Sequence, residues 1–191
     1  MYINHNDYSE SIKELQNVIN LFKINGIDIC LHAGTLLGAV REQDFIKSDN
    51  DVDIFYISNK ITLQEVLNEF NTVITPLLIK NGYKIEPQHW PMLEGNPLML
   101  GQYHISKNKI TIDLWVSWFD KNNNFYVSCC VVGELIKEEI FPLVQVSLHN
   151  SLYYAPKDYD KFLTVIYNTW RIPSLIGLQA NPYFYKNSKL K

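Results

Sequence analysis

The chain has 191 residues, of which 47% are apolar and 19% are charged, a balance that excludes a disordered protein and predicts one compact domain over residues 1–191. Its formal net charge of -3 argues against non-specific binding to nucleic acid or an anionic membrane, because both need a basic surface. No apolar run approaches the roughly 18 residues of a membrane span. Three cysteines without CxxC spacing are typical of a reducing compartment, so we expect a cytoplasmic protein.

The first half of the chain predicts two strands and three helices. Apolar residues at helical spacing predict a first helix over residues 8–24. A β-rich run at 27–33 then predicts a strand, and residues 36–40 begin a second helix. DVDIFYI at 51–57 reads as the next strand, and residues 62–82 as a third helix that kinks or stops near its proline.

The second half of the chain predicts a β-hairpin and a final helix. MLGQYHIS at 99–106 and ITIDLWVSWF at 110–119 alternate as strands do and are separated by a short polar turn. FYVSCCVV at 125–132 predicts a neighbouring strand, and residues 159–170 carry one apolar helical face. Because strands and helices interleave, the expected class is α/β (α+β), with a mixed sheet flanked by helices.

Three aspartates stand out because they adjoin apolar strand positions. Asp51 and Asp53 should project from the same face of one strand, since side chains alternate along it. Two like charges in contact raise the pKa of one group unless a cation neutralises them, and a hard divalent cation is the usual partner. Asp113 lies within an apolar, β-forming run, where an unpartnered carboxylate is costly. Together they predict a site for one or two Mg²⁺ or Mn²⁺ ions that hold a transferring phosphate.

The same aspartates also have a purely structural interpretation. Asp51 and Asp53 would then be strand-end residues beside a loop, and Asp113 would pair with a lysine. The metal site is favoured because Gly34 and Thr35 lie between a strand and a helix, where free backbone N–H groups attract phosphate oxygens. A Gly-Thr pair alone is weak support, since a glycine at a strand exit is more often just a turn.

A family resemblance adds to these observations. GTLLGAVREQDFIKSDNDVDIF at 34–55 resembles the signature of the LicD and fukutin-related family, which is close to GTLLGAxR, a short spacer and IPWDDDIDI. IDLW at 112–115 resembles the strand that carries that family's third aspartate. FPL at 141–143, followed by APKDYDKFLTVIYNTW at 155–170, resembles the family's C-terminal portion. The resemblance covers much of residues 27–173.

The resemblance implies a nucleotidyltransferase-like fold and a metal-dependent transferase. Family members move a phosphocholine or phospho-polyol group from a CDP-activated donor to a glycan, as in cell-surface polysaccharide modification. Such an enzyme would meet a lipid-linked glycan at the inner membrane face. Carried over by position, the catalytic and metal-binding carboxylates are Asp51, Asp53 and Asp113, with Asp49 matching the first aspartate of the family run. The residues that would contact the donor phosphates are Gly34, Thr35 and Arg41.

Two departures and two alternatives remain open at this point. Lys47 and Ser48 stand where the family has Pro-Trp, and Asn50 replaces the middle aspartate of its acidic triplet. One alternative is a nucleotidyltransferase that moves NMP from an NTP to a small molecule, a protein or RNA. The other is a non-catalytic relative that binds nucleotide, against which the intact aspartates argue.

Overall fold

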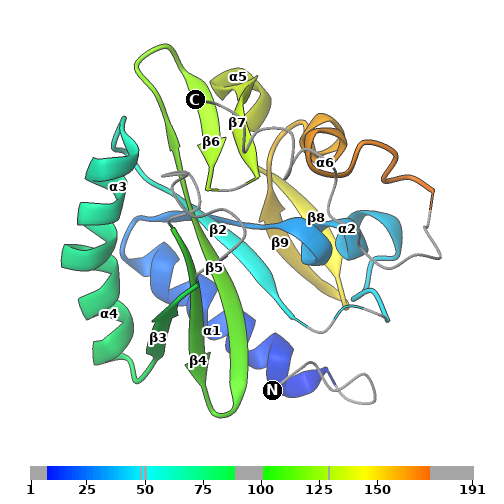
Figure 1. The fold of residues 1–191 in the computed structure, drawn as a ribbon. Coiled ribbons are helices and arrows are strands. Elements are labelled where there is room, and N and C mark those ends of the chain that lie inside the picture. The colour runs from blue at the N-terminus through cyan, green and yellow to red at the C-terminus, as the bar shows by residue number, and fades with distance from the viewer. Residues whose placement is uncertain (1–7, 48, 50, 89–100, 129, 173–191) are drawn as a thin grey trace.

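A computed structural model describes residues 8–47, 49, 51–88, 101–128 and 130–172 (Figure 1). Its helical segments are α1 (Ser9–Ile24), α2 (Ala33–Arg41), α3 (Leu63–Glu69), the π-helix η1 (Phe70–Ile74), α4 (Thr75–Lys80), α5 (Lys137–Ile140) and α6 (Tyr159–Tyr167). Its strands are β1 (Asp28–Leu31), β2 (Asp53–Ile57), β3 (Lys84–Pro87), β4 (Gln102–Lys107), β5 (Ile110–Phe119), β6 (Asn124–Val127), β7 (Val131–Ile136), β8 (Val144–Leu148) and β9 (Ser151–Ala155).

A mixed seven-stranded sheet forms the centre of the fold. Its order is β1-β2-β5-β4-β3, with β6 paired to β5 and β7 to β6, while β8 and β9 form a separate hairpin. β2 and β5 are parallel and the other neighbours are antiparallel. The parallel register places Asp53 opposite Asp113, so the two strands bring their carboxylates to the same end of the sheet. The expected mixed sheet flanked by helices is confirmed.

Helices cover both faces of this sheet. On β2, successive side chains point to opposite faces, and the ring centroid of Tyr56 lies 6.0 Å from that of Phe22 in α1 and 6.3 Å from that of Phe70 in η1. Its neighbour Phe55 instead stacks on Phe162 of α6 at 5.6 Å. Asp53 lies two residues before Phe55 and therefore shares the face that α6 covers.

The longer predicted helices are confirmed, with one irregularity. The helix expected over residues 62–82 begins after Thr62, whose side chain accepts a hydrogen bond from the Glu65 backbone N–H. Before Pro76 it passes through η1, where the Thr75 N–H donates to the Phe70 carbonyl. Proline has no N–H to donate, so the irregularity expected there takes the form of a π-helical turn. The chain then continues as α4 to Lys80.

Other predictions need correction. Gly34 and Thr35 are not a turn before a helix, because α2 already begins at Ala33. The run 125–132 is not one strand, since it contains β6 and the start of β7. The predicted hairpin of β4 and β5 is confirmed, although residues 99 and 100 lie outside the described part. The sequence analysis did not predict β3, α5, β8 or β9.

Within the part of the chain that the structure describes, no helix is both long and apolar enough to cross a membrane.

Candidate active site

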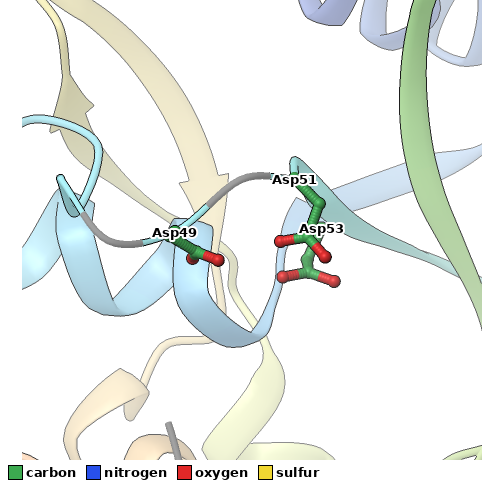
Figure 2. Close-up of side chains that lie close together, drawn as sticks. All are labelled: Asp49, Asp51 and Asp53. Atoms are coloured by element: carbon green, nitrogen blue, oxygen red, sulfur yellow. The ribbon is translucent and has the colours of Figure 1, made fainter. Parts of the chain in front are cut away.

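Three aspartates converge where the loop after α2 enters β2. Carboxylate oxygens of Asp49, Asp51 and Asp53 all lie within 4.8 Å of one another (Figure 2). Asp49 and Asp53 are 9% and 6% exposed, whereas Asp51 is the most exposed of the three. The site therefore concentrates negative charge at a partly enclosed position and offers oxygen ligands only.

The loop that carries Asp49 packs against two glycines of α2. A Cβ atom on Gly34 would lie 1.9 Å from Oδ2 of Asp49, and one on Gly38 would lie 2.5 Å from the Asp44 carbonyl oxygen. Gly34 and Gly38 are four residues apart, so they share one face of the helix. The absence of side chains on this face lets the loop run back along α2 and brings Asp49 to β2. The predicted contact between Gly34 and a donor phosphate stays a prediction.

The start of α2 also fixes the backbone of Asp53. The hydroxyl of Thr35 accepts a hydrogen bond of 2.9 Å from the Asp53 N–H. The His32 N–H donates to the Asp53 carbonyl, also at 2.9 Å. Because Thr35 is 1% exposed, its observed role is to hold β2 against α2. Its predicted contact with a donor phosphate is not tested by this geometry.

Burial and mutual repulsion dominate the electrostatics of the cluster. Burial raises the pKa of Asp53 well above its ordinary value, and the carboxylates of Asp51, Asp113 and Asp49 raise it further. The indole N–H of Trp115 donates to Oδ1 of Asp53 at 3.3 Å and partly offsets this pKa rise. A divalent cation would relieve the repulsion, and carboxylate oxygens are the ligands that Mg²⁺ and Mn²⁺ prefer. The residues present therefore fit such an ion.

Asp113 lies beside the cluster and has hydrogen-bond partners of its own. Nε2 of His104 lies 3.1 Å from its Oδ1, and the Gln102 side-chain amide donates to its Oδ2 at 2.8 Å. Burial raises the pKa of Asp113 to about 6, although His104 acts in the opposite direction. The structure thus gathers Asp49, Asp51 and Asp53 into one group and places Asp113 next to it. The predicted metal-binding role of Asp113 stays a prediction.

Arg41 lies at the other end of α2 from Gly34. Seven residues of helix separate them by about 10 Å along the axis. The guanidinium of Arg41 forms an ion pair with Glu42 at 2.7 Å. The predicted contact of Arg41 with a donor phosphate would compete with this ion pair.

Tyr167 is a candidate site residue that the sequence analysis did not identify. It belongs to the last turn of α6, and burial raises the pKa of its hydroxyl well above the ordinary value. The carboxylates of Asp53, Asp49 and Asp51 raise this pKa further, which places Tyr167 within their electrostatic reach. Like any tyrosine hydroxyl at neutral pH, it is protonated and can donate a hydrogen bond. The sequence showed only that Tyr167 lies on the apolar face of a helix.

The family comparison agrees with this geometry. Residues 26–158 match the LicD/FKTN/FKRP nucleotidyltransferase domain. The chain belongs to this family, and the resemblance of residues 34–55 is confirmed. Membership suggests a phosphotransferase-like activity.

Two curated relatives extend the comparison without assigning an activity. An uncharacterized protein of Rickettsia prowazekii (strain Madrid E) is 25% identical over 162 residues, which cover 82% of this chain and 53% of the relative. An uncharacterized protein of Rickettsia typhi (strain ATCC VR-144 / Wilmington) is 27% identical over 158 residues, covering 82% of this chain and 45% of the relative. The chain spans about half the length of these relatives.

Proposed function

We propose that this protein is a metal-dependent phosphotransferase that moves a phosphocholine or phospho-polyol group from a CDP-linked donor to a glycan acceptor. The observation that carries the proposal is the group formed by Asp49, Asp51 and Asp53, with oxygens within 4.8 Å of one another. Membership in the LicD/FKTN/FKRP family supports the transferase class. The donor and the acceptor come from the family resemblance.

The three aspartates would hold Mg²⁺ or Mn²⁺. When bound, such an ion neutralises phosphate oxygens and orients the transferring group. The protein's contribution is to fix the ligands, and it does so through the glycine face of α2 and the hydrogen bond from the Asp53 N–H to Thr35. Most of the rate enhancement in phosphoryl transfer comes from such positioning and charge neutralisation.

Asp113 is the group best suited to accept the proton of the acceptor hydroxyl. A general base must lie within reach of the acceptor hydroxyl without being bound tightly to the metal, and Asp113 lies beside the three aspartates but outside their group. His104 and Gln102 hold its two oxygens in place. Tyr167, which lies within the electrostatic reach of the aspartates, would donate a hydrogen bond to an oxygen of the donor phosphate.

A thermal-shift panel tests this function. The purified protein is combined with CDP-choline, CDP-ribitol, CDP-glycerol, CTP, ATP or GTP, each with and without Mg²⁺. A ligand at ~100 times its Kd adds ~2.7 kcal/mol, which amounts to several degrees at this chain length. We expect a CDP-alcohol to stabilise the protein only with Mg²⁺ and more than any triphosphate. The preferred head group would then identify the donor.

Product analysis separates the remaining possibilities. The matched domain is described as a nucleotidyltransferase domain, so transfer of NMP from an NTP is the second candidate. Release of CMP from a CDP-alcohol supports the phosphotransferase, and release of pyrophosphate from a triphosphate supports the nucleotidyltransferase. Tight binding without either product would identify a non-catalytic nucleotide-binding protein.

A further inference from the structure

The turn of the β8–β9 hairpin lies against the loop that carries Asp49. The hairpin stands outside the main sheet, and Leu148 pairs with Ser151 across a two-residue turn formed by His149 and Asn150. Both turn residues have a positive φ, of 45° and 62°, as a type I′ hairpin turn requires. Such a short turn has little conformational freedom, so it can hold a neighbouring segment in place.

Two hydrogen bonds join this turn to the loop after α2. The backbone N–H of His149 donates to the Gln43 carbonyl at 2.9 Å. Nδ1 of the same histidine lies 3.0 Å from Oδ1 of Asp44. A carboxylate only accepts hydrogen bonds, so Nδ1 is the donor in this contact. The main chain and the side chain of one residue thus hold two successive residues of the loop.

Asp44 connects this contact to the rest of the loop. Its Oδ1 also accepts a hydrogen bond of 2.8 Å from the Phe45 N–H, and its carbonyl packs where Gly38 has no Cβ. Phe45 is 3% exposed. The ring of Tyr8 stacks on that of Phe45 at 4.8 Å and lies 5.6 Å from that of His149. The turn and the loop therefore pack as one unit.

Asp49 lies a few residues further along the same loop. Its N–H donates to the Ile46 carbonyl at 2.9 Å, and Ile46 directly follows the residues that pack against the turn. From there the carboxylate of Asp49 approaches those of Asp51 and Asp53 (Figure 2). A shift of residues 43–46 would therefore move one carboxylate of the acidic group.

We propose that His149 is a positioning residue for the divalent-cation site. Through Asp44 it holds the loop at the point from which Asp49 reaches the other two aspartates. The inference rests on the cation site of the proposed function and adds to it a residue from a hairpin outside the main sheet. The side chains of His149 and Asp44 are 38% and 46% exposed, so their contact contributes little to global stability.

Two substitutions of His149 isolate its imidazole. His149→Gly keeps the backbone N–H and accepts the positive φ, but removes the contact with Asp44. His149→Asn also tolerates this φ, and its side-chain amide can donate to Asp44 from about the place of Nδ1. Asn150→Gly is the matched control. It makes the same kind of change at the other turn residue, whose side chain is not part of the contact with Asp44.

Isothermal titration calorimetry with Mn²⁺ is the main readout. We expect His149→Gly to raise the Kd about fivefold, less than the 10–100-fold typical of a residue that bonds a metal ligand directly. His149→Asn and Asn150→Gly should stay within about twofold of the wild type, because both keep a donor to Asp44. Urea unfolding of the two glycine variants should show similar, small changes in stability, since the contact is half exposed.

Two further measurements test the route from His149 to Asp49. In an Asp44→Ala background, His149→Gly should cause no further loss of Mn²⁺ affinity, because the contact is already absent. Without metal, the Asp49 amide hydrogen should exchange faster in His149→Gly than in the wild type, because its hydrogen bond to Ile46 opens more often.

The outcomes separate this proposal from the cation site on which it rests. Mn²⁺ binding by the wild type with an unchanged Kd in His149→Gly would overturn only the role of His149. A loss of affinity that His149→Asn does not recover, or that Asn150→Gly shares, would also overturn it. Absence of Mn²⁺ binding in the wild type would instead contradict the cation site itself.

Discussion

At the scale of single residues, Asp53 and Asp113 have raised pKa values and so make the stability of the metal-free protein depend on pH. A carboxylate whose pKa is higher in the folded state binds protons more tightly there, so folding is favoured as the pH falls. Ionisation of Asp113 lowers the free energy of unfolding progressively as the pH rises from its ordinary pKa of 3.8 to its raised pKa of about 6. The pKa of Asp53 is also raised, by burial and by its acidic neighbours, so its ionisation likewise lowers the free energy of unfolding as the pH rises.

We therefore predict that the Asp53→Asn variant without metal is more stable than the wild type at about pH 8, because the wild type must then ionise a buried carboxyl. The variant keeps an oxygen for the Trp115 indole N–H but carries no charge. The advantage should shrink towards about pH 4, where both Asp53 and its unfolded counterpart become protonated. Urea unfolding across this pH range measures the difference. Equal stability of the two proteins throughout would contradict the pKa assignment.

Tyr167 gives a second prediction at this scale. Tyr167→Phe keeps the ring and removes only the hydroxyl donor, so the fold and Mn²⁺ binding should be retained. The rate of CMP release should fall by at least about tenfold, since removing one hydrogen-bond donor to a developing oxyanion typically costs about 10²–10³ in rate. Tyr159→Phe, a matched change in the first turn of the same helix, should have no such effect. If Tyr167→Phe lowered the unfolding temperature as well as the rate of CMP release, the residue would act through packing and not through its hydroxyl.

At the scale of secondary-structure elements, the glycine face of α2 builds the site. Gly34→Ala would clash with the carboxylate of Asp49, whereas Gly38→Ala would clash with backbone atoms at Asp44 and Ile46. A side chain can move aside more easily than a backbone, so the two variants should differ. We expect Gly34→Ala mainly to weaken Mn²⁺ binding, and Gly38→Ala mainly to lower the free energy of unfolding, by about 1–3 kcal/mol.

Both variants are measured by isothermal titration calorimetry with Mn²⁺ and by urea unfolding. The titration tests the effect expected for Gly34→Ala, and the unfolding tests the effect expected for Gly38→Ala. If Gly34→Ala binds Mn²⁺ as tightly as the wild type, Asp49 does not contribute to the ion site. If Gly38→Ala is as stable as the wild type, the loop is not held against the helix in the way the structure shows.

The helices and strands of this fold differ in how well their local sequence predicts them. The long helices and the β4–β5 hairpin were predictable, because their apolar periodicity and turn residues are local features. The position of Gly34 inside α2 was not, since Gly-Thr after a strand is typical of a turn. β8 and β9 are short and lie outside the main sheet, so local periodicity gave little signal for them.

At the scale of the whole molecule, the fold decides which predicted residues meet. The spacing of Asp51 and Asp53 and the apolar setting of Asp113 were enough to predict an acidic site drawn from two strands, although Asp51 lies before β2, which begins at Asp53. The approach of Asp49 depends on the loop that returns along α2, and that of Tyr167 on the docking of α6 (Figure 1). Neither of these placements follows from local sequence. The hydrogen bonds of Asp113 to His104 and Gln102 likewise depend on the pairing of β4 with β5.

The central claim is that Asp49, Asp51 and Asp53 form a divalent-cation site, and direct Mn²⁺ titration calorimetry tests it. The wild type is compared with Asp51→Asn and with Asp160→Asn, the same substitution at an exposed aspartate outside the cluster. We predict saturable Mn²⁺ binding by the wild type and Asp160→Asn, and at least about tenfold weaker binding by Asp51→Asn, because it loses a charged ligand. Equal Mn²⁺ affinity in all three proteins, or none in the wild type, would contradict the claim.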